Sequence, residues 1–147
     1  MKKFSASLAI LALALVLGLA LVGCDNEVDN PLNGTWRDSD GNEIILNNGN
    51  FIMRENGENY LRGTYTDNGS SLTLTPTDYY LDATTAAMLG ITAGWKDKSQ
   101  MTTILSQIGV SDADINEGFA PLTVRYTLNN NTLTLTINGE TGIFTRQ

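Results

Sequence analysis

Histidine is absent from this chain of 147 residues, and cysteine occurs only once, at Cys24. The missing histidine removes the most common general base and metal ligand of proteins. A single cysteine excludes an internal disulfide, so the fold must be held by its hydrophobic core. The chain also lacks a Gly-x-Ser-x-Gly sequence, the nucleophile elbow of many hydrolases. Together these absences argue against an enzyme.

The first residues have the pattern of a secretory signal that ends at Cys24. Two lysines are followed by an apolar run over residues 8–22, and a small residue, Gly23, precedes the cysteine. The run Leu-Val-Gly-Cys resembles the lipobox of bacterial lipoproteins, in which the cysteine is lipidated and becomes the mature N-terminus. An uncleaved membrane anchor is one alternative, but the fifteen apolar residues span about 22 Å of helix, less than the ~30 Å bilayer core. A signal peptide that is cut elsewhere is the other.

Cleavage before Cys24 divides the chain into a lipoprotein signal peptide (1–23), a lipidated tether (24–31) and one domain (32–147). The mature chain of 124 residues carries 7 basic and 16 acidic residues, a net charge of −9. This charge excludes nucleic acid as a partner and gives no attraction to anionic headgroups, so the membrane is reached through the palmitate-type lipid on Cys24. We expect a bacterial cell-envelope protein, with the outer membrane or the cell surface favoured and the inner membrane as the alternative.

Beyond Pro31, short β-rich segments alternate with tight-turn dipeptides. Asn48-Gly49, Asn56-Gly57, Asn68-Gly69 and Asp40-Gly41 recur at the spacing of consecutive antiparallel hairpins. Several segments alternate apolar and polar residues, which indicates a sheet with one buried face. Closing eight such strands into a barrel would leave no unpaired edge. The sequence predicts an all-β, eight-stranded antiparallel up-and-down barrel with strands at 34–38, 43–47, 50–55, 59–66, 71–78, 121–128, 131–137 and 141–146.

Residues 82–120 break the β pattern and predict a short helical insertion between the fifth and sixth strands. Apolar residues recur at helical spacing from Met101 to Ile108, with Ser99 as the expected N-cap and Gly109 just past the end. Residues 111–114 resemble the start of a second short helix. A further turn of helix is expected over residues 84–89.

The opening Leu32-Asn33-Gly34-Thr35-Trp36 resembles the Gly-x-Trp first-strand motif of lipocalins and their calycin relatives. It is still more similar to the small lipocalin-like lipoproteins of bacteria, which repeat Gly-Thr-Tyr and Leu-Thr-Leu-Thr strands; here these are residues 63–65, 72–75 and 133–136. The resemblance implies that Trp36 closes the barrel floor and that Arg146, near the end of the last strand, packs across it. The chain departs from lipocalins in placing its helices mid-barrel rather than after the last strand.

Four aromatic residues are candidate ligand-lining positions: Tyr79 and Tyr80, which lead into the insertion, Trp95 within it, and Tyr126 on a later strand. The first three could stack on a ligand at the barrel mouth or could simply pack the insertion onto the barrel, and Tyr126 could line the barrel wall. The oxygen-rich segment 38–43 suggests a calcium-binding site, but its residues do not have the EF-hand spacing and are typical of a hairpin turn. No metal, cofactor or catalytic residue is predicted.

Two functions remain open. The barrel could be hollow and bind a small apolar or amphipathic molecule that enters beneath residues 82–120. Alternatively, it could be solid and act as a surface interaction module, such as a protease-inhibitor-like barrel. An interior cavity of about 300 Å³ or more would favour the ligand binder, and a packed core would favour the interaction module.

Overall fold

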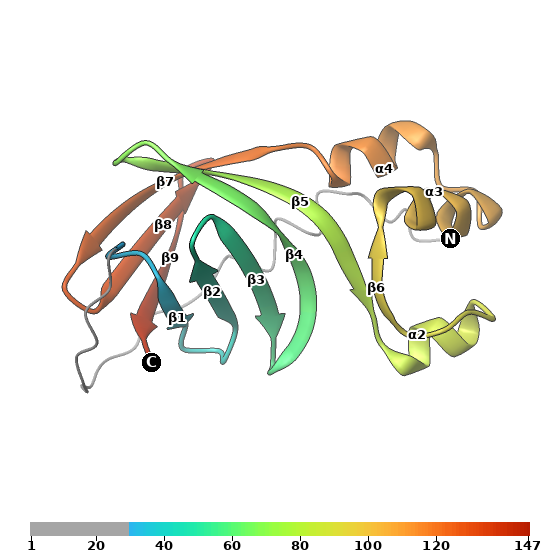
Figure 1. Cartoon of the computed structure of the whole chain (residues 1–147), viewed down its shortest axis with the longest axis horizontal. Helices are drawn as coiled ribbons and strands as arrows, with labels where there is room; N and C mark the ends of the chain where they lie inside the picture. The colour runs from blue at the N-terminus through green and yellow to red at the C-terminus, as the bar shows by residue number, and fades with distance from the viewer. Residues whose placement is uncertain (1–29) are drawn as a thin grey trace.

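The computed structural model describes residues 30–147, so the predicted signal peptide, Cys24 and most of the tether lie outside the described residues. Figure 1 shows a barrel at one end of the described chain and a group of short helices at the other. None of the helices among residues 30–147 is long and apolar enough to cross a membrane.

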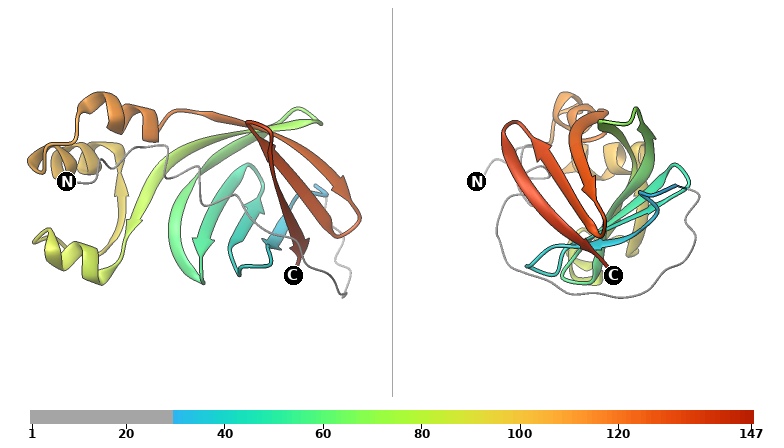
Figure 2. Two further views of the ribbon diagram at one scale, coloured as in Figure 1. Left: turned by 180° about the vertical axis from the view of Figure 1, so that it is seen from behind. Right: turned by 90° about the vertical axis from the view of Figure 1, so that its left-hand side faces the viewer.

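Eight antiparallel strands form the closed barrel, as predicted. Each strand pairs with the next along the chain, except that β5 passes over the insertion to pair with β7 and β9 returns to pair with β1. The view along the barrel in Figure 2 shows how the first and last strands meet. The strands are β1 (Gly34–Arg37), β2 (Glu43–Asn47), β3 (Asn50–Glu55), β4 (Glu58–Asp67), β5 (Ser71–Leu81), β7 (Leu122–Asn129), β8 (Thr132–Ile137) and β9 (Glu140–Arg146).

The tight turns set the register of the hairpins. Asn48 and Gly49 both have positive φ, at 46° and 82°, and Asn56 and Gly57 follow the same pattern at 51° and 82°. Two successive left-handed residues form the type I′ turn, whose twist matches that of the flanking strands. Asparagine and glycine adopt this conformation at the lowest cost, so the sequence itself selects these two hairpins.

The insertion contains helices α2 (Ala83–Met88), α3 (Lys98–Gln107) and α4 (Asp112–Gly118), close to the predicted positions. Ser111 caps α4 by accepting a hydrogen bond from the Asp114 backbone N–H. The predicted N-cap of α3 was wrong: Asp97, not Ser99, caps this helix in a reciprocal capping box with Gln100. A fourth element, strand β6 (Gly94–Asp97), was not predicted, because its four residues show no apolar alternation.

Side chains from all eight barrel strands fill the interior. Trp36, Val124 and Leu133 have 0% of their surface exposed, and Phe51 and Phe144 have 1%. An empty chamber beside these side chains would leave them accessible surface, so the interior is packed solid where they lie. The remaining members of this barrel core are Leu32, Ile44, Leu46, Leu61, Tyr65, Leu72, Leu74, Leu135 and Ile137.

Strand β5 changes partners at a bulge. On one edge it pairs with β7 at residues 71–74 and with β6 at residues 78–81, while β4 holds the other edge. Pro76, which has no N–H to donate, lies in the gap between β7 and β6. The register with β4 shifts at the same place, between Arg62 and Gly63. A bulge of this kind bends a strand, and it carries β5 out of the barrel toward the insertion.

Replacing Gly63 with alanine should destabilise the barrel by about 3 kcal/mol or more, because the added methyl has no room. A Cβ at this position would lie 2.1 Å from the Thr75 carbonyl oxygen and 2.8 Å from the Phe51 ring. Chemical denaturation measures the free energy of unfolding. Gly118→Ala is the matched control, because its Cβ would meet only the Tyr79 hydroxyl, at 3.5 Å. It should stay within about 1 kcal/mol of the wild type. Equal stability of Gly63→Ala and wild type would contradict the packing at the bulge.

Candidate functional site

The four aromatic residues singled out in the sequence do not form one site. Tyr79 and Tyr80 are consecutive residues of β5, so their side chains point to opposite faces of the sheet. Tyr79 lies opposite Leu61 of the barrel core, whereas Tyr80 lies opposite Trp95. Tyr126 hydrogen-bonds near the β4–β5 turn, away from the insertion. These residues therefore belong to three separate environments.

Tyr79 joins the barrel to the insertion. Its ring packs edge-on against Tyr60 at 6.0 Å and against Phe119 at 5.1 Å between ring centroids. Its hydroxyl donates a hydrogen bond of 2.6 Å to the Gly118 carbonyl oxygen at the end of α4. Burial raises the pKa of Tyr79 to about 12. The ring also contacts a second small core formed by Met101, Ile115 and Phe119. Tyr79 is thus occupied by packing on both sides.

Tyr80 and Trp95 form an aromatic cluster on the outer face, together with Arg62. The two rings meet edge-on at 5.2 Å, and the Arg62 guanidinium lies 4.6 Å from the centroid of the Trp95 ring. The same guanidinium binds Asp78, with Nε 3.2 Å from Oδ2, and this hydrogen-bonded contact holds the pKa of Asp78 below its usual value. Arg62 is 42% exposed, so the cluster faces solvent.

Tyr126 points inward near the opposite end of the barrel. It lies opposite Leu135 on β8, and its hydroxyl donates a hydrogen bond of 3.0 Å to Asp67 at the end of β4. Burial, reinforced by the Asp67 carboxylate, raises the pKa of Tyr126 to about 12. This contact secures the β4–β5 turn against β7.

At the barrel floor, Arg146 lies over Trp36. Its guanidinium is 4.4 Å from the centroid of the indole ring and donates hydrogen bonds to the carbonyl oxygens of Asn33, at 2.8 Å, and Pro31. The indole N–H of Trp36 donates to the Leu32 carbonyl oxygen at 2.8 Å. These contacts tie the first described residues to the last strand. They are structural and provide no reactive group.

One charged cluster, centred on Glu43, was not predicted from the sequence. This carboxylate is 6% exposed and binds Arg37 on β1 and Arg54 on β3. The hydrogen bond from Arg37 is the main cause that holds the pKa of Glu43 below its usual value. The three residues are direct cross-strand partners. The pattern becomes visible in the sequence only once the register of both hairpins is known.

The oxygen-rich segment 38–42 serves as a turn. Asp38 accepts hydrogen bonds from the backbone N–H groups of Asp40 and Asn42 and from the Asn42 side chain. Across residues 30–147, no group of three or more acidic residues is arranged to hold a metal ion.

Comparisons with known proteins identify no family for this chain. No family model matches it, and no curated protein matches it. Among solved structures, it is similar to an uncharacterized protein from Bacteroides eggerthii DSM 20697. The match has 13% sequence identity and a TM-score of 0.45, and it covers 78% of this chain and 98% of that one.

Removing the Tyr79 hydroxyl should loosen the insertion without opening the barrel. In Tyr79→Phe, the Gly118 carbonyl loses its hydrogen bond, which should cost about 1 kcal/mol. Hydrogen exchange should then accelerate in α3 and α4 but not in β8 and β9. Tyr80→Phe is the control, because the Tyr80 hydroxyl makes no hydrogen bond within residues 30–147. Uniform acceleration throughout the barrel, or none in the helices, would count against this role.

Proposed function

We propose that this protein is a lipid-anchored interaction module of the bacterial cell envelope, in which a solid barrel holds the insertion as a contact surface for a partner protein. The packed barrel interior carries this proposal. Trp36, Phe51 and Phe144 occupy the space that a lipocalin-like binder would leave for its ligand. This filling favours a contact function over a small apolar ligand held inside the barrel.

The position of the tether supports an arrangement in which the insertion faces away from the membrane. Residues 31–33 are tied to the barrel floor through Arg146, and Leu32 is 1% exposed. The six residues from Asp25 to Asn30 extend at most about 20 Å. An anchor on Cys24 therefore keeps the floor close to the bilayer. The insertion lies at the other end of the molecule (Figure 1).

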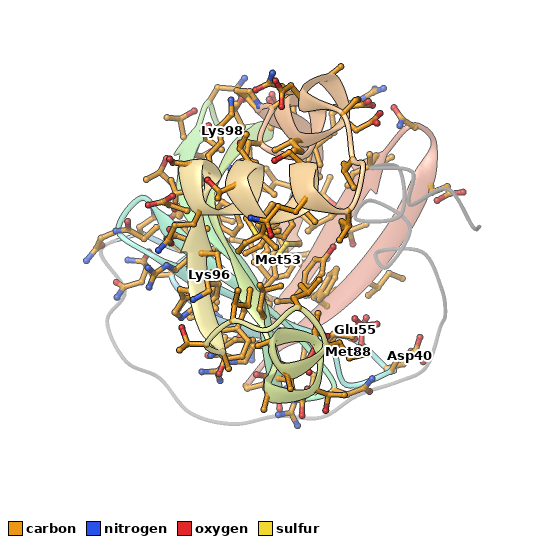
Figure 3. All side chains as sticks on the ribbon, turned by 90° about the vertical axis from the view of Figure 1, so that its right-hand side faces the viewer. Asp40, Met53, Glu55, Met88, Lys96 and Lys98 are labelled. Atoms are coloured by element: carbon orange, nitrogen blue, oxygen red, sulfur yellow. The ribbon has the colours of Figure 1, made fainter. Side chains whose placement is uncertain are left out.

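The insertion exposes apolar side chains that the barrel does not cover. Met88, at the end of α2, is 76% exposed, and Ile108, at the C-cap of α3, is 59% exposed. Figure 3 looks onto this end, with α3 crossing above α2 and Met88 on the surface. Methionine is enriched at protein interfaces, and we assign both side chains to the proposed contact surface.

Cys24→Ala should abolish anchoring. Without the thiol, no acyl chain can be attached, and the acidic domain has no attraction of its own for anionic membranes. We expect metabolic labelling with palmitate to be lost and the protein to leave the membrane fraction after cell lysis. Thr127→Ala, an exposed change on β7, should behave as the wild type does. Membrane retention of unlabelled Cys24→Ala would contradict lipid anchoring.

The contact function can be tested by site-specific photo-crosslinking of the full-length chain in cells. A benzophenone amino acid at Ile108 should give one discrete adduct with another envelope protein. The same group at Ile143, which is 45% exposed on the barrel strand β9, should not give that adduct. Equal labelling at both positions would contradict the insertion as the contact surface. A small apolar molecule that co-purifies with the chain in native mass spectrometry would favour the ligand binder instead.

A further inference from the structure

The outer face of the sheet from β2 to β6 is apolar and aromatic. Ile45 lies opposite Ile52, Ile52 opposite Arg62, and Tyr80 opposite Trp95. These residues alternate along their strands with the inward-facing core residues, so they share the side that faces away from the barrel interior. We call Ile45, Ile52, Arg62, Tyr80 and Trp95 the outer patch.

The charges around the outer patch neutralise one another. Glu43 binds Arg37 and Arg54, Arg62 binds Asp78, and Asp97 caps α3. Counted from Arg37 on β1 to Asp97 on β6, the outer face therefore holds three basic and three acidic residues. Residues 30–147 contain 7 basic and 13 acidic residues in all, so the net charge of −6 lies entirely on other surfaces.

This distribution restricts how two copies of the chain can approach each other. Acidic surfaces repel, and contact is favoured only where the charge is balanced and apolar groups can be buried. The outer patch meets both conditions, and tryptophan, tyrosine and arginine are the residues that dominate the energy of protein interfaces. All five of its residues lie within strands and are half-buried. Such a surface suits packing against a second sheet rather than insertion into a bilayer.

We propose that the outer patch is the interface of a symmetric homodimer. In an isologous pair, the patch of each copy faces the same patch on the other copy. A twofold axis parallel to the barrel axis would leave the floors of both barrels facing the same membrane. Confinement of two anchored copies to one bilayer raises their effective concentration. The dimer does not depend on the partner proposed for α2 and α3, because Trp95 is the one residue of the insertion that belongs to the outer patch.

Disulfide trapping in membranes tests the dimer. Ile52→Cys is introduced into the full-length chain, which is expressed in cells, and an oxidant is added to isolated membranes. We expect a disulfide-linked species of twice the monomer mass. Ile143→Cys, which changes the same residue type on the outer face of β9, should remain monomeric, as should the parental chain. A dimer in both variants would reflect random collision and would overturn the proposal. So would a crosslink from Ile52→Cys to a protein of another mass.

A charge change on the patch provides the second test. Arg62→Glu places net negative charge on each facing patch and should weaken association at least tenfold in sedimentation equilibrium of the full-length chain in detergent. Ile52→Ser removes apolar area without touching the Arg62–Asp78 pair, and it should also weaken association. Circular dichroism checks that each variant is folded. A wild type that stays monomeric at every concentration, or a dimer that survives both changes, would overturn the proposal.

Discussion

The closure of the barrel depends on a short contact between its first and last strands. Only two residue pairs join β1 to β9, Trp36 with Arg146 and Arg37 with Thr145. The Arg146 side chain extends this contact, because it stacks on Trp36 and donates to backbone carbonyls that precede β1. The two ends of the domain are thereby held together by this side chain, by the strand pairing, and by a hydrogen bond of 2.8 Å from the Gln147 N–H to the Thr35 carbonyl oxygen. Without this closure, β1 and β9 would each expose a free edge, and the core between them would be open to water.

Because large side chains fill the closed barrel, we place the proposed function on the outside of the protein. The contrast between neighbouring residues on β5 illustrates this. Tyr79, on the inner side, packs its ring against Tyr60 and Phe119 and donates its hydroxyl hydrogen bond to the Gly118 carbonyl oxygen. Tyr80, on the outer side, packs against Trp95 and, among the rings of residues 30–147, meets no other; it remains close to solvent. This difference supports our proposal that the outside of the protein makes the functional contact.

The strands of the barrel were predictable because asparagine-glycine turns and apolar alternation are local signals. The exit of β5 from the barrel was not, because it depends on a bulge and on a change of partner near Pro76. Strand β6 forms only because β5 offers it an edge.

For the candidate site, the Trp36–Arg146 contact followed from the family resemblance. The four candidate ligand-lining residues lie apart from one another, because alternation along β5 separates Tyr79 from Tyr80 and register places Tyr126 elsewhere. The Glu43 cluster needed the same register.

The way in which β6 replaces β7 explains how the insertion can be added without opening the barrel. Both strands use the same edge of β5, and β4 remains paired with the other edge past the bulge. Strand β5 therefore keeps backbone partners on both edges where it leaves the barrel. The insertion begins on a sheet that is already formed. The small core of Met101, Ile115 and Phe119 then holds α3 and α4 in place. The stability of the barrel and the contact surface of the insertion can consequently vary separately, with Tyr79 as the main side chain that links them.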